Sequence, residues 1–290
     1  MITKPSRAAL ELLVRAALAE DAPWGDLTSE ALIPAETLMD AQLVAREDGV
    51  LCGEDIVALA MQLTDTSTTT TFHVHDGQRF TAGERLATIH GRARAVLQAE
   101  RVALNFVQRL SGIATITAKY VAETAGTGCR IVDTRKTTPG LRLVERYAVR
   151  CGGGRNHRYS LSDAVMAKDN HLAILSASAP GGLTAALLAA REQLPHTTHL
   201  EVEVDRPDQI ETVLAAGVDT ILLDNFSTAE LAAAVRQIAG RALVEASGGI
   251  TLARIREIAS TGVDIISVGA LTHSAPSVDI GLDCHPVHRP

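Results

Sequence analysis

Charged residues and glycines follow six short apolar runs in the second half of the chain. These runs begin at residues 131, 165, 199, 220, 242 and 265. The residues that follow them could bind anions or a metal ion, and they are Arg135 and Lys136, Lys168, Glu203, Asp224, Ser247-Gly248-Gly249 and Gly269-Ala270. A sheet selected only for stability has no reason to end every strand in this way. The pattern therefore predicts one site to which all six strand ends contribute.

The cations among these residues predict an anion-binding site. Arg135 and Lys136 directly follow the first apolar run, and three consecutive glycines at 152–154 precede Arg158. A glycine-rich backbone can approach a ligand closely and present N–H groups to an anion. A guanidinium can also hold a carboxylate through two parallel hydrogen bonds. A solvated basic face is the alternative, but the position of the cations beside strand ends favours a binding site.

Glu203 and Asp224 predict a site for a divalent metal ion. Each ends a strand, and the two strands are one βα unit apart, so we expect the carboxylates to lie side by side. Two carboxylates in a cationic site suit Mg²⁺ that is bridged to phosphate and keeps part of its water. A role as counter-charges for Lys136 and Lys168 is the alternative, and the two roles are compatible.

Two glycine-containing segments predict phosphate-binding loops. Ser247-Gly248-Gly249 follows the fifth run, and Val268-Gly269-Ala270, with His273 close behind, follows the sixth. Free N–H groups and the helix dipole at the start of a helix both favour an anion. One such segment could be only a tight turn, but two in consecutive units favour phosphate. The expected ligand is a phosphorylated sugar together with a carboxylated partner, and no residue pairing indicates a covalent nucleophile.

Strands and helices must alternate to bring these residues together. The last four apolar runs begin 21, 22 and 23 residues apart, with helical patterns at 208–216, 229–239 and 252–260 between them. This alternation predicts βα units and a parallel sheet. The spacing alone does not separate a closed barrel from an open sheet, whereas the chemistry at the strand ends favours a barrel.

The first part of the chain predicts an antiparallel sheet with flanking helices. We expect helices over 6–19 and 54–62, and strands over 41–46, 68–74 and 84–89. The apolar period from 93 to 124 predicts one or two helices, broken near Ser111-Gly112.

Composition limits the class of protein. The chain has 290 residues, enough for two domains or one large barrel, and its formal net charge is −7. An acidic chain with 3% aromatic residues is not expected to bind nucleic acid. Four scattered cysteines, no signal-like segment and no long uncharged apolar stretch predict a soluble cytoplasmic protein. The charge is uneven, because residues 130–171 hold nine Lys/Arg against four Asp/Glu.

That basic window carries the strongest resemblance to a known family. The run from Asp133 to His171, DTRKTTPGLRLVERYAVRCGGGRNHRYSLSDAVMAKDNH, closely resembles quinolinate phosphoribosyltransferase (decarboxylating), also called nicotinate-nucleotide pyrophosphorylase. The segments EDAPWGDLTSE, AERVALNFVQRLSGIAT, LEVEVD, ILLDNF, SGGIT and VGALTHS resemble the same family in the same order. The resemblance implies an N-terminal α/β sandwich domain and an incomplete α/β barrel of the type II phosphoribosyltransferase kind. It places them at 1–110 and 111–274, with a tail at 275–290 that packs back on the first domain.

The resemblance also implies the reaction and the residues that carry it. The family joins quinolinate to 5-phosphoribosyl 1-pyrophosphate, releases pyrophosphate and CO₂, and yields nicotinate mononucleotide for NAD biosynthesis. Lys136, Glu203 and Asp224 are the implied catalytic residues, with Glu203 and Asp224 contacting the ribose and binding Mg²⁺ through water. The implied substrate-binding residues are these three together with Arg101, Thr134, Arg135, His157, Arg158, Lys168, Ser247, Gly248, Gly249, Val268, Gly269, Ala270 and His273.

The resemblance at Arg101 also implies that the protein forms oligomers. By resemblance Arg101 reaches the neighbouring subunit's site in a homodimer, and a hexamer built from such dimers stays open. Three other functions also stay open at this point: a homologue of the same fold from molybdenum-transport operons, a nicotinate-specific transferase, and a binding protein without catalysis. The pattern R-N-H-R and K-D-N-H around His157 and Lys168 favours the quinolinate enzyme over the first of these.

Overall fold

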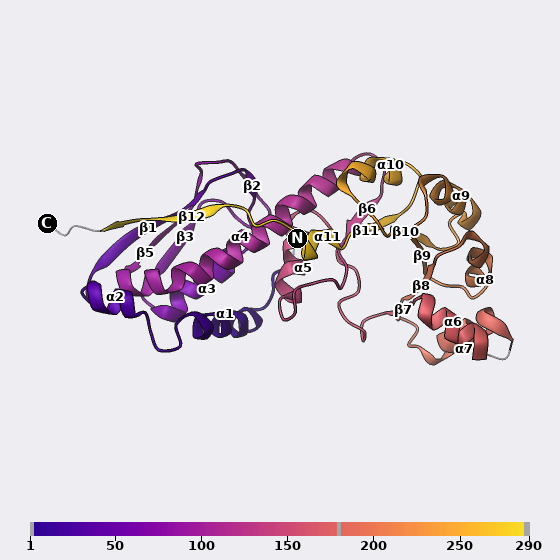
Figure 1. Cartoon of the computed structure of the whole chain (residues 1–290), viewed down its shortest axis with the longest axis horizontal. Helices are drawn as coiled ribbons and strands as arrows, with labels where there is room; N and C mark the ends of the chain where they lie inside the picture. Colours follow the sequence, from indigo (N-terminus) through magenta and orange to yellow (C-terminus); the bar gives the residue numbers. More distant parts are fainter. Residues whose placement is uncertain (1–2, 179–180, 287–290) are drawn as a thin grey trace. The chain divides into compact units, whose positions relative to one another are not determined.

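The computed structural model describes residues 3–178 and 181–286 (Figure 1). The chain forms two compact units that do not follow chain order. The first contains residues up to 118, 137–153 and those from 271 onward, and the second contains 119–136 and 154–270. In the part of the chain that is described, no helix is both long enough and apolar enough to span a membrane.

An antiparallel sheet forms the centre of the first unit. Its strand order is β12-β1-β5-β3, with bounds Ile280–Pro286, Leu38–Ala45, Arg85–Arg92 and Thr69–Phe72. Burial alternates strictly along β1, because successive side chains of a strand point to opposite faces. A second pair joins β2 (Gly49–Val50) to β4 (Arg79–Phe80), and the helices are α1 (Arg7–Asp21), α2 (Leu27–Leu32), α3 (Glu54–Thr64) and α5 (Arg142–Cys151).

The predicted break near Ser111-Gly112 is wrong, because α4 (Ala93–Glu123) is a single helix. Both residues serve packing inside the first unit. A β-carbon added at Gly112 would overlap the carbonyl oxygen of Pro276, so glycine is needed for close approach of that segment. Ser111 is fully buried, and its hydroxyl accepts the backbone N–H of Cys52 at 3.1 Å. The pair reads like a helix break in the sequence but satisfies tertiary contacts.

Six parallel strands form an incomplete α/β barrel in the second unit. The strand order is β6-β11-β10-β9-β8-β7, with bounds Arg130–Val132, Ile265–Ser267, Leu243–Ser247, Thr220–Asp224, Leu200–Val204 and Val165–Ala167. These positions confirm the predicted βα spacing. Within the described residues β6 and β7 are not paired, so the barrel is open between them. A single parallel bridge from Val132 to Arg155 places the loop after residue 154 beside β6.

Helices follow the strands of the second unit in chain order. They are α6 (Asp169–Ser178), α7 (Gly182–Gln193), α8 (Ile210–Leu214), α9 (Thr228–Ile238) and α10 (Ile255–Ala259), and α11 (Ala270–His273) follows β11. Short 3₁₀ turns, Pro207–Gln209 and Leu252–Arg254, precede α8 and α10. The core is aliphatic, and Ile210, Ile221 and Leu223 are among its fully buried side chains. All six strands therefore end at one rim, where the site lies.

Candidate active site

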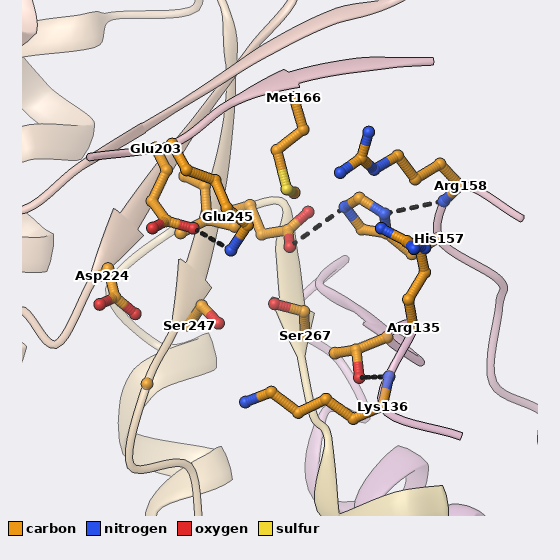
Figure 2. Close-up of a pocket in the computed structure, with 14 residues that line it drawn as sticks. Arg135, Lys136, His157, Arg158, Met166, Glu203, Asp224, Glu245, Ser247 and Ser267 are labelled. Carbon is orange, nitrogen blue, oxygen red and sulfur yellow. Dashed lines mark hydrogen bonds and ion pairs between the residues drawn. The ribbon is translucent and has the colours of Figure 1, made fainter. Parts of the chain in front are cut away.

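A cavity of about 440 Å³ opens at the carboxyl ends of the parallel strands (Figure 2). Its volume falls in the range typical of small-molecule sites. All of its lining residues belong to the second unit, and they are Thr134, Arg135, Lys136, His157, Arg158, Met166, Lys168, Glu203, Leu222, Asp224, Glu245, Ser247, Gly248 and Ser267. Cations and acids from distant parts of the chain thus surround one space.

The cavity brings together most of the residues singled out in the sequence. The predicted residues that line it are Thr134, Arg135, Lys136, His157, Arg158, Lys168, Glu203, Asp224, Ser247 and Gly248. Gly249 lies in the loop after β10, Val268 and Gly269 lie in the loop after β11, and Ala270 begins α11, but none of these four residues lines the cavity. Arg101 is exposed on α4 and His273 is exposed at the end of α11, and both belong to the first unit.

Asp133 holds the loop that carries His157. It directly follows β6 and is fully buried. Its carboxylate accepts the Asn156 side-chain N–H at 2.6 Å and the His157 backbone N–H at 2.7 Å. Two hydrogen bonds to one buried carboxylate fix the loop in the opening of the barrel, so the His157 ring reaches the cavity wall from the side that lacks a strand.

The His157 ring contacts two buried acids. Its Nε2 lies 3.0 Å from Glu201 and 3.6 Å from Glu245, while its Nδ1 accepts the backbone N–H of Arg158 at 2.7 Å. Burial lowers the pKa of His157, but the hydrogen bond to Glu201 and the charge of Glu245 outweigh it and raise the pKa. The Arg158 N–H opposes this, because a protonated imidazole has no acceptor nitrogen. The hydrogen-bond geometry assigns the neutral ring, with the Nε2 proton donated to Glu201.

Glu245 lies deep in the cavity and is 1% exposed. Burial and the charge of Glu201 raise the pKa of its carboxyl to about 7, against the lowering effects of His157 and of a hydrogen bond with Ser267. Its Oε1 is buried and has no hydrogen-bond partner among the described residues. The same holds for one oxygen of Glu201. A buried polar atom without a hydrogen bond destabilises the folded protein, so such an atom in a native structure often marks a functional site.

Two other acids sit higher on the rim and are half-buried. Glu203 on β8 forms an ion pair with Lys168 at 2.9 Å. Asp224 ends β9 and accepts the side-chain N–H of Asn225 at 2.7 Å. Both carboxylates line the same cavity, and Figure 2 shows them on the same side of it. Their hard oxygen donors, partly open to water, fit a Mg²⁺ ion that keeps part of its hydration shell.

The guanidinium groups occupy the opposite wall (Figure 2). Burial and then the positive charge of Arg135 lower the pKa of Arg158, whose Nη1 donates to the Ala164 carbonyl at 3.0 Å. The Nε of Arg135 is buried and has no hydrogen-bond partner among the described residues. Two like charges and an unsatisfied donor are favourable only when an anion joins them.

Gly248 sets the shape of the rim between β9 and β10. Its φ is +84°, and a β-carbon there would overlap the Asn225 side chain. The Asn225 N–H donates to the Ser247 carbonyl at 3.0 Å, so the two loops are tied together. Glycine is required at this position because both the backbone conformation and the space exclude a side chain.

Sequence analysis missed Asp133, Glu201 and Glu245 as parts of this site. A signal existed for the two glutamates, because each stands two residues before a predicted site residue in the same strand, Glu203 or Ser247. A period of two places such pairs on one face of a strand. A charged residue within an otherwise apolar strand could therefore have indicated an inward-facing acid, although this signal was not used.

A second cluster lies in the first unit, where ligand atoms of Cys52, Asp76 and Cys151 fall within 4.8 Å of one another. The Asp76 carboxylate accepts the backbone N–H groups of Gly53 and Glu54 at 2.8 and 3.1 Å, and the Tyr147 hydroxyl at 2.9 Å. Asp76 therefore caps the start of α3, and its oxygens are already satisfied.

Comparison with known families matches nearly the whole chain. The family model described as quinolinate phosphoribosyl transferase, N-terminal domain, matches residues 26–111. The corresponding C-terminal domain model matches residues 113–283. Together the two matches cover both units, including all residues that line the cavity.

Individual relatives are similar over most of their length. The nicotinate-nucleotide pyrophosphorylase [carboxylating] of Mycobacterium leprae is 44% identical over 93% of this chain and 95% of its own. A probable enzyme of the same name from Bacillus subtilis is 42% identical over 91% of this chain and 89% of its own. The crystal structure of NadC from Streptococcus pyogenes superposes with a TM-score of 0.93 at 40% identity, covering 99% of this chain and 100% of that one.

Proposed function

Because this chain belongs to the quinolinate phosphoribosyltransferase family, we propose that it transfers the phosphoribosyl group of 5-phosphoribosyl 1-pyrophosphate to quinolinate. The products are nicotinate mononucleotide, pyrophosphate and CO₂, as in the de novo route to NAD. The observation that supports this most directly is one cavity with guanidinium groups on one wall and a carboxylate pair on the other. The cationic wall suits the two carboxylates of quinolinate, and the acidic wall suits the ribose and a metal ion on the pyrophosphate.

The cationic wall would hold quinolinate. Arg135 and Arg158, with His157 beside them, can orient the two carboxylates through charge-assisted hydrogen bonds. The unsatisfied Nε of Arg135 is a donor that such a ligand would complete. Lys136 and Lys168 would add positive charge near the sugar phosphate, with Thr134 next to them.

The acidic wall would hold the ribose and a metal ion. We propose that Glu203 and Asp224 bind Mg²⁺, through water at least in part, because both present half-buried carboxylates to the cavity. The bound ion would supply positive charge to the pyrophosphate group. The 5-phosphate and pyrophosphate would be received by the loops Ser247-Gly248-Gly249 and Val268-Gly269-Ala270, together with His273.

The reaction then follows from fixed charges rather than from a covalent intermediate. As the bond from C1 of the ribose to pyrophosphate breaks, positive charge develops on the ribose, and Glu203 and Asp224 lie where they can stabilise it. The quinolinate nitrogen forms the new bond to C1 and becomes a pyridinium. Its positive charge stabilises the electron pair left on C2 when the 2-carboxylate departs as CO₂. Lys136 would stabilise the departing pyrophosphate.

We propose that the working assembly is a homodimer in which Arg101 reaches the partner's site, with a hexamer of such dimers as an extension. Arg101 is exposed on α4 and has no hydrogen bond or ion pair within the described residues. Trp24, Leu27 and Leu32 also expose between 76% and 90% of their surface on the first unit. Large exposed apolar side chains of this kind favour contact with another chain. We also propose a cytoplasmic location, where the four free thiols would stay reduced.

One assay tests the proposed function against its rivals. Release of labelled CO₂ from carboxyl-labelled quinolinate is measured with and without 5-phosphoribosyl 1-pyrophosphate and Mg²⁺. We expect release only when both are present. Transfer to nicotinate without CO₂ would instead indicate a nicotinate-specific enzyme, and binding without turnover would indicate a non-catalytic protein or a divergent homologue.

A further inference from the structure

Glu245 lines the cavity between its acidic and its cationic walls. Figure 2 shows its carboxyl between the Glu203 side of the cavity and the His157–Arg158 side. If the cations hold the carboxylates of quinolinate and the acids hold the ribose, then the bond between them forms in this space. C2 of quinolinate is the ring atom next to the reacting nitrogen, so it lies in the same space.

The surroundings of Glu245 favour a carboxyl group that carries a proton. It is 1% exposed, its Oε1 has no hydrogen-bond partner among the described residues, and no Lys or Arg within that part of the chain forms an ion pair with it. The Nε2 proton of His157 is directed to Glu201 at 3.0 Å, and Glu245 is farther away at 3.6 Å. An ionised carboxylate in this position would be costly, whereas a neutral acid is not.

Charged groups of both signs line the cavity together with Glu245. They are Arg135 and Lys136 after β6, Lys168 after β7, Glu203 on β8, Asp224 on β9, and His157 and Arg158 in the loop, while Glu201 on β8 contacts His157 and β11 contributes only the neutral Ser267. Lys168 is already paired with Glu203. Burial is the largest cause that raises the pKa of the Glu245 carboxyl to about 7, and the negative charge of Glu201 is the second.

We propose that Glu245 is the acid that protonates C2 of the pyridine ring after decarboxylation. This rests on the proposed function. The bond from C2 to the 2-carboxylate breaks, CO₂ leaves, and the electron pair stays on C2. The Glu245 O–H bond then breaks as the C2–H bond forms, which leaves a carboxylate. Solvent returns one proton to Glu245 before the next turnover, so the step consumes one proton per CO₂.

The difference between Glu203 and Glu245 explains why Glu245 is suited to protonate C2. Glu203 is bound to Lys168 and opens toward water, so its carboxylate can remain charged beside the ribose. Glu245 is deeper and lacks a cation partner. The same residue type is thus placed in two environments that favour opposite protonation states, which is a common arrangement for acid and electrostatic roles in one site.

The first test compares Glu245→Gln with the unmodified enzyme. Glutamine keeps the size and the hydrogen bond but cannot give up a proton. We expect CO₂ release to slow by about 100-fold or more, the range of general acid catalysis, while the KM values of both substrates change by less than about 3-fold. Glu257→Gln, an exposed position on α10, serves as the control and should match the unmodified enzyme. CO₂ release by Glu245→Gln at the unmodified rate would overturn the proposal.

The second test measures kcat as a function of pH, and its deciding result comes from the unmodified enzyme. The proton must be present on Glu245, so kcat of the unmodified enzyme should fall as pH rises above about 7. Glu201→Gln removes the neighbouring charge and should move this fall to lower pH, and Glu245→Gln, if folded, should lack it. A kcat that stays constant to pH 9 in the unmodified enzyme would overturn the assignment. If the unmodified enzyme releases no CO₂ at all, the proposed function fails instead, so the two failures are distinguishable.

Discussion

At the residue scale, residues of the same type in this site contact different groups. Glu203 has Lys168 at 2.9 Å, whereas the nearest cation-forming group to Glu245 is His157 at 3.6 Å. Arg158 and Arg135 lie close enough for their charges to oppose each other. The repulsion between the two guanidinium groups is unfavourable by itself and becomes favourable when a dianionic ligand lies between them. The unfavourable energy of the free site is thus recovered as binding energy.

Arg158 carries the first prediction. Arg158→Ala should raise the KM for quinolinate by about 30-fold, since loss of a partially buried charged partner costs about 2 kcal/mol or more. The KM for 5-phosphoribosyl 1-pyrophosphate should stay within about 3-fold. Initial rates over both substrates measure this. Arg158→Lys is the matched control, and it should recover only part of the loss because an ammonium cannot make the two-pronged contact. Normal turnover of Arg158→Ala at low quinolinate would contradict the assignment.

Glu203 carries the second prediction. Chelation of Mg²⁺ should abolish turnover, and Glu203→Ala should require about 10-fold more Mg²⁺ because one of two carboxylates is lost. Titration of activity with Mg²⁺ measures this shift. Asp205→Asn removes the same charge from an exposed position two residues away and should leave the titration unchanged. An identical Mg²⁺ titration for Glu203→Ala would count against a metal role.

Glu245 carries a prediction about stability. Its carboxyl pKa in the folded protein, about 7, is raised above the ordinary value of 4.5. A raised acid destabilises the folded state once pH exceeds its unfolded pKa, and the loss grows until pH passes the folded pKa. Glu245→Gln should therefore stabilise the protein at pH 8 by about 1–3 kcal/mol and give little gain at pH 4.5. Urea denaturation at the two pH values measures this, and equal effects at both would exclude the raised pKa.

At the element scale, the strand ends and the loops between them position the chemistry. The period of two along β8 places Glu201 and Glu203 on one face, and the same period along β10 does so for Glu245 and Ser247. The opening between β6 and β7 admits the loop fixed by Asp133. In the first unit, Gly112 lets the Pro276 segment approach α4 closely.

Gly112 tests that account of α4. Helix propensity alone predicts that Gly112→Ala stabilises the protein by about 1 kcal/mol. The overlap with the Pro276 carbonyl predicts the opposite, a loss of about 1–3 kcal/mol. Urea denaturation followed by circular dichroism decides between them. Lys119→Ala, an exposed change in the same helix, should stay within about 0.5 kcal/mol of the unmodified protein.

At the scale of the whole molecule, the proposed dimer makes each site depend on two chains. Arg101→Ala and Lys136→Ala should each be nearly inactive alone. In a mixed dimer, one site would combine an intact Lys136 with the partner's intact Arg101. Refolding the two variants together should therefore restore up to about a quarter of the unmodified activity, because half of the random dimers have one good site. No recovery in the mixture, with dimers present by light scattering, would show that Arg101 does not act across subunits.

The sequence by itself determined the alternation of strands and helices and the identity of the residues at the strand ends. These features are local: a spacing of 21–23 residues predicts βα units, and residues that follow parallel strands must share a rim. Resemblance along the chain then indicated the family, and the family comparisons confirm it.

Only the tertiary structure decided which acids are buried, which are paired, and how the His157 loop enters the barrel. The need for glycine at position 112 of α4 and the surroundings of Glu245 depend on neighbours that are far away in the chain, namely Pro276 for Gly112, and His157 and Glu201 for Glu245. A residue's pKa and the space around it depend on such neighbours, so no local pattern could supply them. The sequence placed Glu245 in a strand, and the fold buried it in the cavity wall beside His157 and Glu201.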